Sequence, residues 1–244
     1  MKKRIQSQRG ASSKPPLTLS LRGHSLFKNV SSDLLSRIER YVYHREYEPR
    51  QIIYFPEDHC DFVYLVHEGQ VKITRHLKTA GASGPTRELT LRHLFPGDLF
   101  GEECLMERSK REAYAEAVAP AVLFLIRAPD FRRMVRDENE LTLLLARHLI
   151  MRANETEQVL AETTFKTVRG RVAASLVRLR QKAPENERAV VRVTHQEIAS
   201  LVGSTRETTT AVLHDLRDEG VVRTANRRVA VLDPAALERI ARSS

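Results

Sequence analysis

The stretch VTHQEIASLVGSTRETTTAVLHDLRDEGVV, residues 193–222, decides the fold of the C-terminal third of this 244-residue chain. Thr194 followed three residues later by Glu197 is a capping box, which predicts that a helix begins there. Gly203 interrupts the helical pattern, and a second helix follows it and ends near Gly220. Two short helices joined by a glycine-containing turn indicate a helix-turn-helix.

The flanking segments extend this motif into a winged helix-turn-helix domain, predicted over residues 167–244. The segment GRVAASLVRLRQK, residues 170–182, places its apolar side chains on one face of a helix. After the motif, VVRTANRRVAVLD alternates like a small hairpin, or wing, with Arg227 and Arg228 near its tip. The chain closes with DPAALERIAR, a helix that begins with an Asp cap and a Pro in the first turn.

Three consecutive threonines, residues 208–210, are unexpected in a helix, because β-branched residues with hydroxyls are mediocre helix formers. They are explained if the outer face of this helix lies in a DNA major groove. Arg206, Thr210 and His214 are four residues apart and therefore share that face. Arginine pairs with guanine, and a carboxylate such as Glu207 accepts from cytosine N4.

Hydroxyl groups at the start of the second helix have two interpretations. Ser204, Thr205 and Thr208 suit a phosphate at a helix N-terminus. Alternatively, Ser204 and Glu207 form only a second capping box, which leaves Arg206 unexplained. The predicted DNA contacts are Thr194, His195, Gln196, Ser204, Thr205, Arg206, Glu207, Thr210, His214, Arg227 and Arg228.

The preceding part of the chain, residues 26–137, has the pattern of a β-domain. Segments such as QIIYF, FVYLV and AVLFLIR are rich in β-branched and aromatic residues, and Gly or Pro turns separate them. Many short strands at regular spacing indicate a jelly roll or barrel. KTAGASGPTR is expected to form a long hairpin loop. With the helical C-terminal half, this gives an α+β fold.

Between the two domains, residues 138–166 are predicted to form one long helix without internal Pro or Gly. Apolar residues recur every three to four positions and make a narrow stripe, which is typical of a coiled-coil partner. A dimerisation helix is preferred over a helix that lies on its own β-domain. The predicted dimer contacts are Leu141, Leu145, Leu149, Ala153 and Leu160.

The composition points to a polyanionic partner. Forty Lys and Arg against 31 Asp and Glu give a formal charge of +9, which favours nucleic acid, although a solubilising basic surface would look the same. No apolar run is long enough to span a bilayer, so no membrane partner is expected. The basic residues 1–25 are predicted to be a disordered arm rather than a secretory signal. Only two cysteines suggest a reducing compartment, so a cytoplasmic protein is expected.

The sequence resembles the cyclic-AMP receptor protein and FNR family of bacterial transcription regulators over about residues 26–240. FPGDLFGEECL, FKTVRGRVAASLVRL and the helix-turn-helix stretch carry the resemblance. It implies a cyclic-nucleotide-binding jelly roll, a long dimerisation helix and a winged helix-turn-helix. It further implies a homodimer on a pseudo-palindromic operator of double-stranded DNA, with RNA polymerase as a partner for activation. Arg206 and Glu207 match the family's half-site-reading pair, but Ala211 stands where members usually carry a second Arg, so the half-site is expected to differ.

The resemblance also suggests an effector pocket. Gly101 and Glu102 match the turn that holds a ribose hydroxyl in the cyclic-AMP-binding members. Counting back from the next strand places Arg111 and Glu112 where those members hold the cyclic phosphate. Ungapped counting along the long helix places Thr156 where they contact adenine. Glu112 would set a negative charge against a phosphate. Cyclic AMP, another small effector and no effector at all therefore remain open.

Other chemistries are expected to be absent. The iron–sulfur branch of the family uses an N-terminal cysteine cluster, which this chain lacks, and the haem-binding branch has Cys where this chain has Gly101. His59 and Cys60 alone cannot make a metal site. Cys104 is expected to be a buried structural residue rather than a thiol sensor. Scattered histidines argue against a jelly-roll enzyme, and a ligand-binding module acting through protein interaction is the alternative to a DNA-binding regulator.

Overall fold

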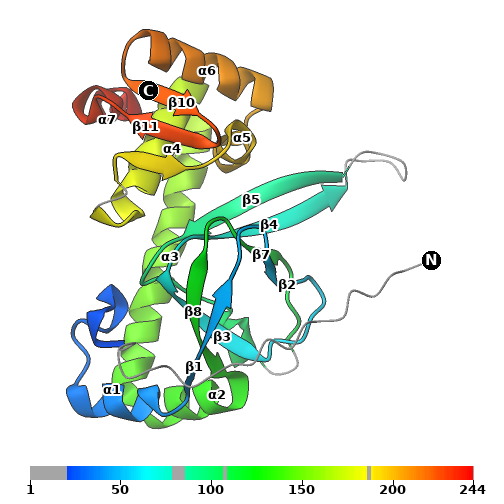
Figure 1. Ribbon diagram of the computed structural model, residues 1–244, viewed down its shortest axis with the longest axis vertical. Coiled ribbons are helices and arrows are strands. Elements are labelled where there is room, and N and C mark those ends of the chain that lie inside the picture. The colour runs from blue at the N-terminus through cyan, green and yellow to red at the C-terminus, as the bar shows by residue number, and fades with distance from the viewer. Residues whose placement is uncertain (1–20, 79–85, 107–108, 186–187, 244) are drawn as a thin grey trace.

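The computed structural model describes residues 21–78, 86–106, 109–185 and 188–243 (Figure 1). The predicted N-terminal arm therefore lies mostly outside the described residues, as does the centre of the predicted hairpin loop. Within the described part of the chain, no helix is long and apolar enough to cross a membrane.

Two four-stranded antiparallel sheets form the N-terminal β-domain, with strand orders β1-β8-β3-β6 and β2-β7-β4-β5. Inward-facing aromatic and aliphatic side chains such as Phe100, Leu123 and Leu125 fill the space between them. This arrangement agrees with the expected jelly roll. The strands are β1 (Val42–Tyr47), β2 (Ile52–Tyr54), β3 (Phe62–Glu68), β4 (Val71–Lys78), β5 (Thr86–Leu94), β6 (Leu99–Phe100), β7 (Tyr114–Ala117) and β8 (Ala121–Arg127).

Short helices cover one end of the β-domain and lead into the long helix. They are the 3₁₀ turns η1 (Leu21–Gly23), η2 (Ser25–Phe27) and η3 (Glu102–Leu105), with α1 (Ser32–Glu39) and α2 (Ala128–Asp137). The long helix α3 (Asn139–Phe165) runs from this end of the molecule to the C-terminal elements (Figure 1). The long helix expected between the domains is therefore present.

The dimer prediction is wrong for the first turns of α3. Leu141 and Leu145 are only 3% and 5% exposed, and they pack with Phe131 in the core of their own β-domain. They cannot face a second subunit without unfolding that core. Leu149, Ala153 and Leu160 are exposed, so those three remain available for a dimer interface.

The C-terminal domain is a helical core with a small sheet of order β10-β11-β9. Apolar faces of its helices meet in one cluster that includes Leu176, Ile198, Leu213 and Leu237. This is the expected winged helix-turn-helix. Its elements are α4 (Val168–Lys182), β9 (Val190–Arg192), α5 (His195–Val202), α6 (Arg206–Asp218), β10 (Val222–Ala225), β11 (Arg228–Val231) and α7 (Pro234–Arg242).

Local capping fixes the two helices of the motif. Thr194 and Glu197 form the predicted capping box of α5, and Gly203 ends that helix with a left-handed φ of 63°. The alternative box between Ser204 and Glu207 is wrong, because Thr205 is the N-cap of α6 and accepts a hydrogen bond from the Thr208 amide. Glu207 is therefore not used as a cap.

Candidate DNA-binding surface and effector pocket

The three threonines of α6 have three different environments. Thr209 is fully buried against the domain core, so it cannot contact DNA. The Thr208 hydroxyl lies 2.9 Å from that of the N-cap Thr205. Thr210 is half-buried, and its hydroxyl lies 3.0 Å from Nδ1 of His195, which ties the start of α5 to α6. Thr209 therefore has a structural role in the core, whereas the hydroxyls of Thr208 and Thr210 contact polar groups at the start of α6 and α5.

The solvent-facing side of α6 carries Arg206, Glu207, Ala211 and His214, all exposed. Within the described part of the chain, neither Arg206 nor Glu207 forms an ion pair. Burial lowers the pKa of His195, and the neighbouring His214 and Arg206 lower it further. The face therefore presents both a cationic donor, Arg206, and an anionic acceptor, Glu207, to solvent.

The remaining predicted DNA contacts belong to the start of α5 and to the wing. Thr194 is engaged with the Glu197 carboxylate through both its amide (2.7 Å) and its hydroxyl (2.9 Å), while Gln196 is exposed. Arg227 and Arg228 are exposed at the tip of the wing, where Arg227 has a φ of 63°. A crevice of 240 Å³ separates this region from the β-domain. It is lined by Pro49, Arg50 and Val118 on one side and by Thr194, Arg227 and Arg228 on the other.

The predicted effector pocket centres on Arg111, whose side chain is only 1% exposed. Its Nη1 donates to Oε2 of Glu103 at 2.9 Å, and its Nη2 donates to the Phe62 carbonyl. The guanidinium lies over the Tyr54 ring, 4.4 Å from the centroid. Gly101 has a φ of 84°, and a Cβ there would come within 2.8 Å of Arg111 Nη1. The glycine therefore makes room for the arginine.

The Glu102 side chain is also buried, and its carboxylate is already engaged in an ion pair. One of its oxygens forms an ion pair with Arg152 of α3, while Oε2 has no partner in the described chain. Burial lowers the pKa of Arg152 to about 10, and the nearby positive charge of Arg92 acts in the same direction. Sequence reasoning missed Glu103 and Arg152. Two signals could have indicated them: Glu103 is the second acid of the Gly-Glu-Glu turn, and Arg152 is a basic residue beside the apolar stripe of the long helix.

Two of the predicted effector residues do not reach this pocket. Glu112 is exposed and pairs with Arg75 on the surface of the sheet, so its predicted place opposite a phosphate is wrong. Thr156 is exposed on α3, and its hydroxyl donates to the Arg152 carbonyl. It borders a 300 Å³ cavity between β5, α3 and α4, which Arg152 also lines.

The cysteines and metal-ligating residues show no further site in the described residues. Cys60 and Cys104 are both buried, and burial raises the pKa of the Cys104 thiol to about 12. A thiol in such a site is a poor nucleophile. The described residues contain no group of three or more side chains that could hold a metal ion.

A cyclic-nucleotide-binding fold joined by a long helix to a helix-turn-helix defines a transcription regulator. Residues 44–138 match the cyclic nucleotide-binding domain, and residues 170–240 match the Crp-like helix-turn-helix domain. The chain belongs to the CRP/FNR family of transcription regulators.

Named relatives support this assignment. The cyclic AMP receptor protein of Thermus thermophilus is 33% identical over 91% of this chain and 98% of its own length. The CRP-like cAMP-activated global transcriptional regulator of Mycobacterium tuberculosis is 28% identical over 89% of this chain and 96% of its own. The crystal structure of TTHB099, a CRP-family regulator of T. thermophilus, is 34% identical with a TM-score of 0.67. It covers 82% of this chain and 97% of that one.

Proposed function

We propose that this protein regulates transcription by binding a pseudo-palindromic DNA site as a homodimer. The observation that carries the proposal is the exposed face of α6, on which Arg206 and Glu207 have no ion pair within the described residues. On this proposal the two side chains read base edges in the major groove. RNA polymerase is the implied partner where the regulator activates.

Dimerisation is supported by α3. Besides the buried Leu141 and Leu145, the helix carries Leu143, Ile150 and Leu160, which are between 59% and 68% exposed. Their separations of seven and ten residues place them on one face of the helix. Exposed apolar side chains in such a row mark an interaction site, and a second copy gives the twofold symmetry that a palindrome requires.

Replacing Arg206 by Ala should weaken binding to the best duplex by about 1–3 kcal/mol and relax specificity at one base pair. The loss follows from removing the paired hydrogen bonds to a guanine. Titrations of the best duplex and of single-base variants measure both effects. Arg239→Ala, an exposed arginine on α7, is the matched control and should leave affinity nearly unchanged. Unaltered base preference in Arg206→Ala would contradict this role.

For the effector, we propose that cyclic AMP binds poorly to the conformation described. The buried Arg111 is already paired with Glu103, and that carboxylate would repel a phosphate beside it. A second ion pair, between Arg152 and Glu102, occupies the carboxylate that the family resemblance assigns to a ribose hydroxyl. A constitutive regulator or one with a different effector fits this pocket better.

Glu103→Gln should bind cyclic AMP at least about tenfold more tightly than the unmodified protein, because removing one like charge beside the phosphate site is worth roughly one pKa unit of interaction. Isothermal titration measures both affinities. Glu112→Gln, which changes an exposed carboxylate next to Arg111, is the control and should have no effect. Micromolar binding by the unmodified protein would show that the pocket is open after all.

A further inference from the structure

The centre of the solvent-facing side of α6 carries two small side chains, Thr210 and Ala211. Ala211 is exposed and ends in a single methyl group. Thr210 is half-buried and lies on the same side of the helix as Arg206 and His214. Neither Thr210 nor Ala211 can make the paired hydrogen bonds with which an arginine reads guanine. If this face reads DNA, its centre therefore uses a different kind of contact.

The Thr210 hydroxyl is engaged by the neighbouring helix. Its Oγ1 lies 3.0 Å from Nδ1 of His195, the first residue of α5. Exposed threonines of α3 behave differently, because the hydroxyls of Thr156 and Thr163 donate to the carbonyls four residues earlier. Within the described residues, Thr210 has no such bond. Its side-chain rotamer is therefore set by α5 rather than by its own helix.

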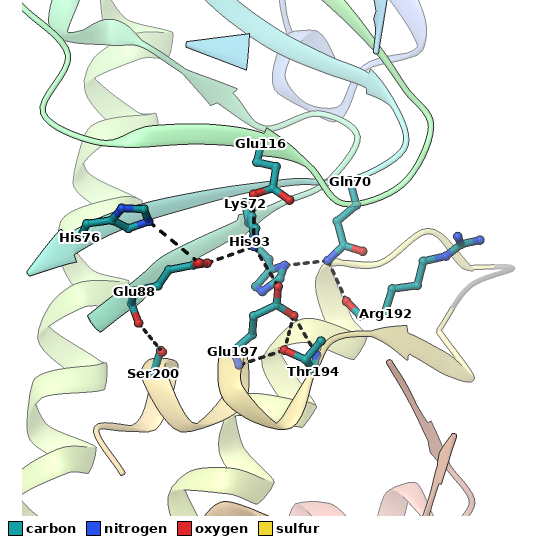
Figure 2. A network of polar contacts seen from close by, with 10 residues as sticks. All are labelled: Gln70, Lys72, His76, Glu88, His93, Glu116, Arg192, Thr194, Glu197 and Ser200. Carbon is teal, nitrogen blue, oxygen red and sulfur yellow. Dashed lines mark hydrogen bonds and ion pairs between the residues drawn. The ribbon is translucent and has the colours of Figure 1, made fainter. Parts of the chain in front are cut away.

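The start of α5, from which His195 extends, is fixed on two sides. Thr194 and Glu197 bond each other through the capping box, and Figure 2 shows Glu197 between Thr194 and Lys72 of β4. Oε1 of Glu197 lies 3.3 Å from Nζ of Lys72, which is buried. His195 therefore presents its ring to Thr210 from an anchored helix turn.

The surroundings of His195 favour its neutral ring. Burial lowers the pKa of His195, and the neighbouring His214 and Arg206 lower it further. A neutral imidazole has one donor and one acceptor nitrogen, so Nδ1 bonds the Thr210 hydroxyl in one of two directions. In both arrangements the hydroxyl is engaged. The methyl group is then the part of the Thr210 side chain that is left for a base edge.

We propose that the methyl groups of Thr210 and Ala211 read the C5-methyl group of a thymine in each half-site, with His195 as the positioning residue for Thr210. Side chains recognise this methyl group in the major groove by apolar contact, and Ala and the threonine methyl are suited to it. The inference rests on the proposed DNA-binding function and deepens it, because it names a base that the operator contains.

The position of Thr210 also limits where this thymine lies. Thr210 follows Arg206 by four residues, which is a rise of about 6 Å along the helix. Successive bases along a DNA strand are about 3.4 Å apart. The thymine should therefore lie within about two base pairs of the base that Arg206 reads.

Removing single methyl groups from the DNA tests the inference with the unmodified protein. Each thymine in the half-sites of the best duplex is replaced in turn by uracil, which lacks only the methyl group. At one position we expect about fourfold weaker binding for one half-site and about fifteenfold for both, because burying one such group is worth about 0.8 kcal/mol. At the same position, 5-methylcytosine should bind more tightly than cytosine.

A protein variant links this effect to Thr210. Thr210→Ser removes the methyl group but keeps the hydroxyl that contacts His195. In this variant, the change from thymine to uracil should weaken binding by about twofold or less, because the interaction between the two methyl groups is already lost. Thr142→Ser is the matched control. It removes the same group from an exposed threonine near the start of α3 and should keep the full effect.

The role of His195 is tested by the preference for thymine over uracil rather than by affinity alone. His195→Ala frees the Thr210 side chain and should reduce this preference. His195→Asn keeps a polar atom near the position of Nδ1 and should restore it. Equal weakening of binding to the thymine and uracil duplexes in His195→Ala would overturn the positioning role.

Two results would overturn the reading of thymine. One is a best duplex in which no thymine responds to replacement by uracil, and the other is a Thr210→Ser protein that keeps the full response. Both leave the proposed function standing, since sequence-specific binding is still observed. If the unmodified protein binds no duplex, the proposed function itself fails, and the inference with it.

Discussion

A monomeric protein that no longer binds its operator is the expected result of replacing Ile150 by Asp. Ile150 is 59% exposed on α3, on the same face as Leu143 and Leu160. In the proposed dimer this face is covered by the same face of a second copy, and a carboxylate there would be buried beside its symmetry mate. An unpaired buried charge is costly, and two like charges at a twofold axis repel each other.

The loss of DNA binding should be large. A dimer engages two half-sites at once, and losing the second engagement costs roughly 10²–10⁴-fold in affinity. Sedimentation velocity measures the subunit state, and titration of the palindromic duplex measures the affinity. Met106→Asp is the matched control, because Met106 is 61% exposed but directly follows η3 in the β-domain and is not part of the apolar row on α3. A dimeric Ile150→Asp protein with normal affinity would contradict the proposed interface.

Acid should destabilise the folded protein between about pH 6.5 and pH 4, because two buried histidines resist protonation. Burial lowers the pKa of His93 to about 4. The charge of Glu197 raises this pKa, and the charge of Lys72 lowers it. Burial also lowers the pKa of His24 to about 4, and the neighbouring His67 adds to the shift. Both rings are less than one tenth exposed.

The direction of the effect follows from proton binding. Below the ordinary histidine pKa of 6.5, the unfolded chain binds protons that the folded protein excludes, so the free energy of unfolding falls as the pH is lowered. Each histidine should contribute a loss of up to about 3 kcal/mol by pH 4. This stability is fully present near neutral pH.

Urea unfolding at about pH 7 and about pH 4.5 measures the loss. His24→Gln and His93→Gln should each flatten the dependence on pH, whereas His59→Gln, which replaces an exposed histidine, should not. Equal sensitivity to acid in all three variants would show that groups other than His24 and His93 cause the loss.

The helix-turn-helix could be predicted from sequence because its signals are local. Thr194 with Glu197 and the left-handed Gly203 fix the bounds of α5 through contacts within a few residues. The cap of α6 was less certain, since Ser204 and Thr205 are both good caps and their order decides which one is used. The burial of Thr209 inside a polar run also required the packing of α6 to be known.

The dimer stripe and the effector pocket depended on contacts between distant segments. One apolar period runs along all of α3, but Leu141 and Leu145 are buried in the β-domain while Ile150 and Leu160 are exposed, and periodicity cannot distinguish the two groups. Similarly, Arg111 pairs with Glu103 eight residues away and Glu102 pairs with Arg152 on another element. Counting along the chain placed Arg111 in the pocket but also placed Glu112 there, although that side chain is exposed and pairs with a surface arginine.

The most direct test of the central claim is selection from a randomised duplex library at fixed moderate salt, with and without cyclic AMP. Fixed salt is necessary because phosphate contacts make affinity depend on ionic strength. We predict enrichment of a pseudo-palindrome whose half-sites lie about one helical turn apart, in both arms of the experiment. Enrichment of no palindrome in either arm would contradict a dimeric, sequence-specific DNA-binding regulator.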